Sequence, residues 1–339
     1  MLEGIVSGKR LIENFLRNRM TNQELLREIR LLRRRVDRLS RELEALKARS
    51  LEDPTLVEHL LKVRGLQVFR CNPSERLFFP SDLTPFQRAR FYELMKKYSF
   101  RLVLRDIMKC SESFRPRDLT HYCSENVCRR YCDALFEMGV ILKEGRGKYR
   151  VQTTHPANLG PTLEWFVAEM FKREFASSAL YGIKLRDTPT GGDYDVIASW
   201  NGKLVYVEVK SSPPRGIELN EIHTFFSRLD TLLPDVAILF NDTQLRMKDK
   251  LVVMFEETLA RRHGEDPSET PRVERLVEEL FHMDHRIYIV NSKKDVLQNF
   301  HLCLHDALKN QNSLHPLRAS SRMEGETAKP SPQGIGEKP

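Results

Sequence analysis

The stretch Gly191–Ser212 reads GGDYDVIASWNGKLVYVEVKSS and decides the fold. Within it, residues 204–210 alternate between apolar side chains and a second set that consists of Tyr206, Glu208 and Lys210. Successive side chains of a β-strand point to opposite faces of the sheet, so Glu208 and Lys210 share one face. The pattern therefore predicts a strand that carries an acid and an amine side by side.

A second predicted strand precedes this one and pairs with it. Residues 195–200 read DVIASW, and the following Asn201-Gly202 is the strongest short signal for a two-residue hairpin turn. A hairpin about this turn places Asp195 at the far end of its strand, across from Glu208 and Lys210. We therefore expect two carboxylates and an ammonium group at one end of the hairpin.

These three side chains suit metal-assisted chemistry. Carboxylates at this spacing are hard oxygen ligands for Mg²⁺ or Mn²⁺, and a neighbouring lysine can stabilise negative charge or position a water molecule. In a plainer interpretation, Glu208 and Lys210 form an ion pair on an edge strand. Their apolar neighbours favour a central strand instead, where an unpaired charge is costly.

The hairpin resembles the restriction-endonuclease-like PD-(D/E)xK superfamily of nucleases. The matching residues are Asp195, Glu208 and Lys210, spaced as D-x12-E-V-K, together with Gly191-Gly192 before the first strand. The sequence of this segment is most similar to the resolvase-like and repair-nuclease branches of the superfamily. The resemblance implies hydrolysis of DNA phosphodiester bonds, with Mg²⁺ or Mn²⁺ held by Asp195, Glu208 and the backbone carbonyl of Val209. Lys210 would orient the attacking water.

A fourth acid is implied by the same resemblance. The segment Gly160–Phe175, GPTLEWFVAEMFKREF, predicts a helix upstream of the hairpin. Many family members carry a glutamate on this helix that joins the metal site, and Glu164 is the matching residue. Glu169 falls on a different face of the helix and is expected to be solvated.

The pattern downstream continues an αβββαβ core, a fold of the α/β class. We expect helices near Leu219–Leu232 and Met247–Arg262, and strands at Asp235–Phe240 and Arg286–Val290. The resemblance covers about residues 158–305.

The chain departs from the family pattern in two respects. No proline precedes the first acid, and Asp193 lies two residues before Asp195 on the same strand face. Asp195 is favoured because it directly abuts the apolar run of residues 196–198, but the choice between the two acids stays open. The spacing D-x12-ExK alone occurs by chance in many proteins.

The preceding residues 80–153 resemble a winged helix-turn-helix domain. Helices are expected at Pro85–Lys109, Arg117–Tyr122 and Ser124–Met138, Gly139 then ends the last helix, and a hairpin turns at residues 144–147. The resemblance implies DNA contacts from the recognition helix and the wing. The candidate DNA-binding residues are Asn126, Arg129, Arg130, Arg146 and Lys148. A spacer or protein-binding role is the alternative.

A cysteine group in this region raises the question of zinc. His121, Cys123, Cys128 and Cys132 lie close together in the sequence. Cys128 and Cys132 are four residues apart on one predicted helix face and no CxxC pair accompanies them, so we expect core packing rather than a zinc site.

Residues 22–50 predict a parallel two-stranded coiled coil. The apolar positions alternate in steps of four and three and are Leu25, Ile29, Leu32, Val36, Leu39, Leu43 and Leu46. Charges at the flanking positions agree with a parallel register, pairing Glu28 with Arg33 and Glu42 with Lys47. We therefore expect a homodimer, and the alternative is a single helix laid on the same chain.

Composition limits the class of protein. The chain has 339 residues, a net charge of +8 and six cysteines, with no apolar run long enough to cross a bilayer and no secretory signal pattern. We expect a cytoplasmic protein without a membrane partner. The charge is uneven, at +6 for residues 1–50, +6 for 80–153 and −5 for 154–311. This is expected if the first portion holds a polyanion and the second uses metal-binding carboxylates, and it equally fits solvated helix faces.

The predicted organisation has five parts. They are the coiled coil (1–52), a connector (53–79), a winged-helix-like domain (80–153), a PD-(D/E)xK nuclease-like domain (154–311) and a disordered tail (312–339). The preferred function is a Mg²⁺-dependent deoxyribonuclease. One alternative is a catalytically inactive nuclease-fold protein that binds DNA or regulates. Another is a transcription regulator whose C-terminal domain senses a ligand.

Overall fold

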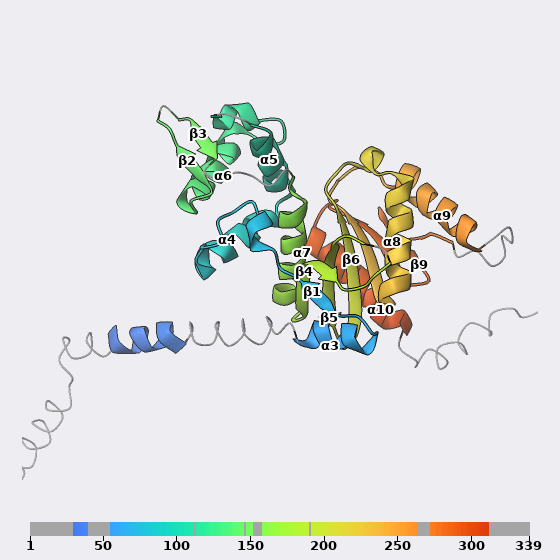
Figure 1. Cartoon of the computed structure of the whole chain (residues 1–339). Coiled ribbons are helices and arrows are strands. Elements are labelled where there is room, and N and C mark those ends of the chain that lie inside the picture. The colour runs from blue at the N-terminus through green and yellow to red at the C-terminus, as the bar shows by residue number, and fades with distance from the viewer. Residues whose placement is uncertain are drawn as a thin grey trace, which may run out of the picture. The chain divides into compact units, whose positions relative to one another are not determined.

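The computed structural model describes a large part of the chain, which divides into two compact units, Met1–Asp53 and Pro54–Pro339 (Figure 1). The described residues are 30–39, 55–110, 113–145, 147–151, 158–189, 191–263 and 272–311.

In the first unit, residues 30–39 form a helix. Three of the predicted heptad positions fall in it, and Leu32, Val36 and Leu39 are each more than half exposed. The remainder of the predicted coiled coil lies outside the described residues, as does the predicted tail. The parallel dimer through residues 22–50 stays a prediction.

The second unit is built on a mixed sheet of eight strands in the order β1-β4-β5-β6-β7-β10-β9-β8 (Figure 1). The strands are β1 (Val68–Arg70), β4 (Ser178–Leu185), β5 (Tyr194–Trp200), β6 (Lys203–Lys210), β7 (Val236–Asn241), β8 (Glu274–Val277), β9 (Leu280–Met283) and β10 (Ile287–Asn291). β6 pairs with β7 and β7 with β10 in parallel, and the other neighbours are antiparallel. β6 is thus a central strand, as its apolar flanks predict.

Helices pack on this sheet. They are α3 (Thr55–Val63), α7 (Gly160–Glu174), α8 (Leu219–Leu232), α9 (Val253–His263) and α10 (Val296–Gln311). Val205 and Val207 of β6 belong to the same apolar cluster as α7 and α10. Tyr206 belongs to a second cluster with α3, α8 and α9. The predicted alternation of β6 is confirmed, and the class is mixed α/β.

The chain order α7-β4-β5-β6-α8-β7 follows the expected αβββαβ sequence of elements. Three features differ from the prediction. The helix expected over 247–262 begins with a π-helical turn, η4 (Lys248–Val252), and continues as α9. The hairpin of β8 and β9 was not predicted. The connector supplies α3, a short helical turn η1 (Ser74–Arg76), and β1, which pairs with β4 at the edge of the sheet.

Residues 85–151 contain helices and a short hairpin in the expected order. The elements are α4 (Pro85–Met95), α5 (Tyr98–Lys109), η2 (Pro116–Leu119), α6 (Glu125–Glu137), β2 (Ile141–Lys143) and β3 (Tyr149–Val151). The single long helix predicted over 85–109 divides because Lys97 is extended, with φ −82° and ψ 118°. Gly139, with φ +71°, follows the end of α6, a left-handed conformation that glycine adopts readily.

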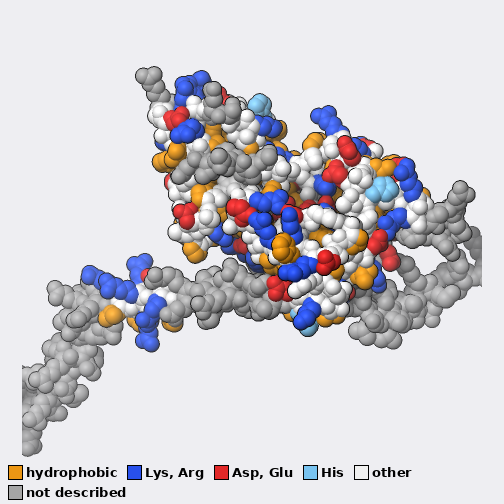
Figure 2. All heavy atoms as spheres, viewed as in Figure 1, with side chains coloured by type: hydrophobic (Ala, Val, Ile, Leu, Met, Phe, Trp, Pro, Cys, Tyr) orange, Lys and Arg blue, Asp and Glu red, His pale blue; other side chains and the backbone are white. Residues whose placement is uncertain are grey.

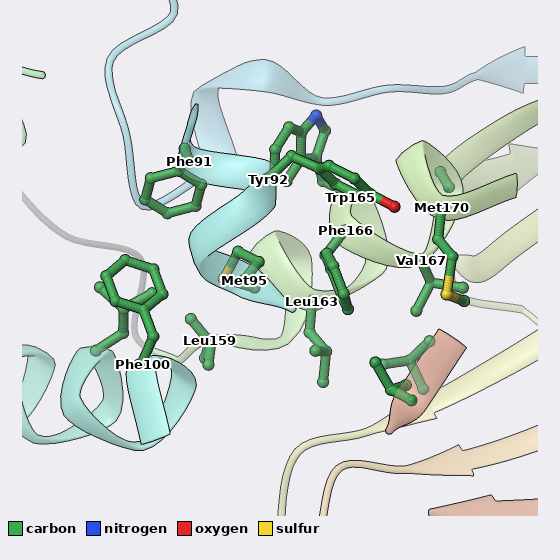
Figure 3. Close-up of a cluster of buried hydrophobic side chains, with 14 of the residues drawn as sticks. Phe91, Tyr92, Met95, Phe100, Leu159, Leu163, Trp165, Phe166, Val167 and Met170 are labelled. Carbon is green, nitrogen blue, oxygen red and sulfur yellow. The ribbon is translucent and has the colours of Figure 1, made fainter. Parts of the chain in front are cut away.

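An aromatic core joins this segment to α7. Figure 3 shows Phe91 and Met95 of α4 beside Trp165 and Phe166 of α7, and the ring centroids of Phe91 and Trp165 are 5.8 Å apart. The cluster is fully buried, so the helices before residue 151 and the sheet after residue 178 share one apolar core. Within the part of the chain that the structure describes, no helix is both long and apolar enough to span a membrane.

Candidate active site

The hairpin register brings Asp195 to the Glu208 end of β6. Val196 pairs with Val207 and Ile197 with Tyr206, so continuing by one residue places Asp195 opposite Glu208. The Val209 backbone N–H donates to Asp195 Oδ2, with N and O 2.7 Å apart. The structure therefore brings together Asp195, Glu208 and Val209, the residues that the sequence proposes as metal ligands.

Lys210 lies between two carboxylates. Its Nζ is 3.1 Å from Glu208 Oε1 and 2.8 Å from Glu221 Oε1 of α8. Burial disfavours the charged amine, but Glu208 and Glu221 outweigh burial and raise the pKa of Lys210. Lys210 is therefore a cation at neutral pH, and Glu221 is a partner of Lys210 that the sequence analysis missed. Its only sequence signal is the pattern Glu218-x-x-Glu221, which caps the start of α8.

Arg228 of α8 is a second cation that the sequence analysis missed. Its Nη1 lies 2.6 Å from Glu208 Oε2 and 3.2 Å from the Tyr206 hydroxyl. Tyr206 also donates a short hydrogen bond to Glu208 Oε2. Arg228 follows Glu221 by two helical turns, so the two lie on one face of α8, but no local pattern in the sequence indicates that this face meets β6.

Glu164 joins the group from α7. Burial and the neighbouring carboxylates of Asp193 and Glu208, opposed by Arg76 and Arg228, raise the pKa of Glu164 to about 7. Burial and the charges of Glu208 and Glu164 likewise raise the pKa of Asp195 well above its usual range. Burial and the neighbouring carboxylates therefore both disfavour the charged forms of Glu164 and Asp195.

Gly182 leaves space beside Asp195 and Glu164. Gly182 of β4 lies opposite Asp195, between the pairs Tyr181–Val196 and Ile183–Tyr194, and has φ +54°. A Cβ at this position would lie 2.8 Å from the Pro73 ring and 3.6 Å from Glu164 Oε2. A larger residue would crowd the connector and the Glu164 carboxylate.

Asp193, the competing first acid, has different surroundings from Asp195. Its two oxygens lie 2.5 Å from Arg76 Nη1 and 3.3 Å from Lys184 Nζ. Arg76 comes from the connector, outside the predicted nuclease domain. Asp193 is thus neutralised by two cations, whereas Asp195 faces other acids.

The donor set has the chemistry that Mg²⁺ or Mn²⁺ requires, because the carboxylates of Glu164, Asp195 and Glu208 interact with one another and carboxylate oxygens are hard ligands. As they lie, no three His, Cys, Asp or Glu side chains among the described residues enclose a position for an ion. Both oxygens of Glu208 face cations, Lys210 and Arg228. The residues fit the ion by charge and donor type, and binding requires Glu208 to change partners.

The predicted DNA-binding residues lie away from this cluster in the sequence. Asn126, Arg129 and Arg130 are exposed on α6, and Lys148 is exposed between β2 and β3. Arg146 lies outside the described residues. Figure 2 shows basic and acidic side chains interspersed on the face that is drawn. The contribution of these residues to DNA binding stays a prediction.

Two cysteines of α6 pack in the core, as the sequence predicts. Cys128 and Cys132 are buried, and the sulfur of Cys128 lies 3.3 Å from that of Cys123. His121 Nδ1 instead lies 3.4 Å from an oxygen of Asp106.

Comparisons with known proteins find similarity only among solved structures. No protein-family model matches the chain, and neither does any curated protein. Protein VC1899 from Vibrio cholerae is 15% identical, with a TM-score of 0.45 over 75% of this chain and 61% of that one. Can2 from Sulfobacillus thermosulfidooxidans, in complex with cyclic tetra-adenylate, is 12% identical, with a TM-score of 0.41 over 75% of this chain and 60% of that one. The chain thus spans less than two thirds of either protein, and the function must be argued from the site itself.

Proposed function

We propose that this protein is a metal-dependent deoxyribonuclease of the restriction-endonuclease-like PD-(D/E)xK type, which hydrolyses phosphodiester bonds. One observation carries the proposal. Asp195 and Glu208 meet at the end of a central hairpin beside Lys210, and burial together with the charges of Glu208 and Glu164 raises the pKa of Asp195. Buried acids with shifted pKa values in such a group are typical of functional sites.

Asp195, Glu208, Glu164 and the Val209 carbonyl are the residues that would hold Mg²⁺ or Mn²⁺. Such an ion, when bound, supplies positive charge at the phosphate and promotes ionisation of water. Asp195 is preferred over Asp193 as the first acid, because Arg76 and Lys184 already neutralise Asp193.

Lys210 has its own role in the proposal. Glu208 and Glu221 hold its ammonium group and keep it protonated. A protonated amine is a hydrogen-bond donor and cannot act as a base. Lys210 would therefore orient the attacking water and stabilise negative charge as it develops on the phosphate.

The substrate and the assembly are the finer part of the proposal. The exposed residues Asn126, Arg129, Arg130 and Lys148, with Arg146, would hold duplex DNA in the manner of a winged helix. Dimerisation through residues 22–50 would let two active sites address two strands.

A plasmid-nicking assay tests the activity. Purified protein is incubated with supercoiled, linear, single-stranded and branched DNA in Mg²⁺ or Mn²⁺, with and without EDTA. Lys210→Ala and Glu208→Ala should each abolish cleavage and leave DNA affinity nearly intact. Lys203→Ala is the matched control, because Lys203 lies at the opposite end of the same strand. Cleavage that survives both site substitutions would refute the assignment.

A second candidate is a catalytically inactive protein that keeps this fold to bind DNA or regulate. The observation that favours it is the direct contact of Arg228 with Glu208, which leaves that carboxylate occupied. EDTA-insensitive DNA binding without nicking of any DNA form would support this candidate. A change of DNA affinity on addition of a small ligand would point to the sensing variant of it.

A further inference from the structure

Arg228 occupies an unusual position in the acid cluster. Its side chain is 10% exposed, its Nη1 is 2.6 Å from Glu208 Oε2, and its guanidinium lies 5.3 Å from the centre of the Tyr194 ring. It therefore forms a buried ion pair with the central carboxylate of the proposed metal site.

The loop before β5 is shaped around this guanidinium. Gly192 has φ +92°, and a Cβ there would lie 3.4 Å from Arg228 Nη2. Because this backbone conformation is strained for other residues, glycine lets the loop pass close to the arginine. Gly192 belongs to the Gly191-Gly192 pair that the sequence pattern singles out.

The hydrogen bonds of Arg228 are incomplete. Both of its described hydrogen bonds come from Nη1, and its buried Nε has no partner among the described residues. An arginine that holds a carboxylate firmly uses two parallel N–H groups. Arg228 thus contacts Glu208 through one nitrogen only. In another orientation its guanidinium could donate more hydrogen bonds.

The charges around Glu208 conflict with simultaneous binding of a divalent ion. Oε1 faces Lys210 and Oε2 faces Arg228. An ion that binds Glu208 on the Asp195 side would meet the guanidinium at close range, and like charges at that separation repel strongly.

We infer that Arg228 is a built-in counter-cation that neutralises the acid cluster in the metal-free protein, competes with the divalent ion for Glu208, and leaves that carboxylate when the ion binds. This inference rests on the proposed function. The competing explanation is that Arg228 merely holds Glu208 in the right orientation. The two explanations predict opposite changes in metal affinity when the charge of Arg228 is removed.

The experiment measures Mn²⁺ binding to the full chain by the loss of the free-ion signal in electron paramagnetic resonance. Arg228→Met keeps the length of the side chain and removes its charge. We expect Mn²⁺ to bind about tenfold more tightly to this variant, the size of effect that one neighbouring charge has on a carboxylate equilibrium. Unchanged or weaker binding would overturn the inference, and weaker binding would support the orienting role.

Arg262→Met is the matched control. Arg262 also pairs with a carboxylate, 2.5 Å from Asp230 Oδ2, and also lies over an aromatic ring, 5.6 Å from the centre of Phe226. It has no contact with the acid cluster among the described residues. Its removal should leave Mn²⁺ affinity unchanged.

Thermal unfolding gives a second measurement. In EDTA, Arg228→Met should have a lower Tm than the unsubstituted protein, and Mn²⁺ should raise its Tm by more. Tighter binding without that pattern would mean that Arg228 does not stabilise the metal-free cluster, which contradicts the inference.

The outcomes separate this inference from the proposed function. Equal Mn²⁺ binding by both proteins overturns the inference and leaves the metal site standing. Binding by Arg228→Met alone supports the inference but counts against metal-dependent activity of the unsubstituted chain. If neither folded protein binds Mn²⁺, both the inference and the metal site are wrong.

Discussion

Two carboxylates at the same end of the β5-β6-β7 part of the sheet, the half-buried Asp195 and the buried Asp242, have opposite surroundings. Asp242, directly after β7, accepts from Arg101, Arg105 and Ser292 at distances of 2.6 to 3.1 Å. Although burial alone would raise it, these arginines hold the pKa of Asp242 below its usual range. Burial and neighbouring acids raise the pKa of Asp195 instead.

The difference separates an acid that holds the fold together from one that is available to a ligand. A buried charge with a full set of partners is stable in place, and removing a partner is strongly destabilising. A buried charge among like charges favours protonation or a cation. The two sites are close, because the Asp242 N–H donates to the Lys210 carbonyl, with N and O 2.8 Å apart.

Asp242→Asn is the substitution with the largest expected effect on stability. The change leaves the buried Arg101 without its counter-charge, so the free energy of unfolding should fall by about 3–5 kcal/mol. Urea denaturation measures it. Arg101→Met should cause a similar loss, and a change below about 1 kcal/mol in both variants would mean that this site does not stabilise the fold.

Gly182→Ala tests the space beside the acid cluster. The added Cβ would contact Pro73 at 2.8 Å in a left-handed conformation. We expect a loss of about 2–3 kcal/mol in the free energy of unfolding, from backbone strain and displacement of the connector. Gly202→Ala is a useful control, since Gly202 also has positive φ but no atom within 4 Å of its Cβ position. Equal losses in the two variants would assign the whole effect to the backbone.

The pH dependence of stability should reveal both sites with opposite signs. The folded protein keeps Glu164 protonated up to about pH 7, whereas the unfolded chain ionises it near 4.5. The free energy of unfolding in EDTA should therefore fall as pH rises through that window, by on the order of 2 kcal/mol for Glu164, and Glu164→Gln should reduce the fall to the part that Asp195 contributes. Asp242 has a lowered pKa, so its contribution is present above its ordinary value of 3.8 and is lost as pH falls below it. A rise in stability from pH 4.5 to 7 that Glu164→Gln leaves unaltered would contradict the assignment for Glu164.

The smallest expected effect is that of Asp195→Asn. Burial and the neighbouring acids raise the pKa of Asp195, so its charged form destabilises the metal-free fold. The amide oxygen can still accept from Val209, so the variant should gain about 1 kcal/mol in EDTA while losing Mn²⁺ binding. Calorimetry in EDTA and with Mn²⁺ measures both. A destabilised variant would show that Asp195 is a structural acid like Asp242.

Local sequence patterns predicted the residues at the centre of the site. They could not predict the contacts that residues of distant elements make with it. Asp195, Glu208 and Lys210 could be placed together because strand alternation and the Asn201-Gly202 turn are encoded within a few residues. Arg228 and Arg76 reach the site from a helix and from the connector, and no local pattern specifies which residues of distant elements meet. The strands β1, β8 and β9 have only three or four residues each, too short for a periodic signal.

The ion pair between α5 and the end of β7 bears on how a substrate would be presented. Rotating the α4–α6 region about the sheet would separate the Arg101 guanidinium from Asp242 and leave two buried charges unpaired, so this ion pair opposes such a rotation. If α6 binds DNA as proposed, the ion pair favours a constant distance between the bound DNA segment and the cleaved phosphodiester bond. Such an enzyme would cleave at a fixed distance from the DNA segment that it binds. Any variation in that distance would come from bending of the DNA.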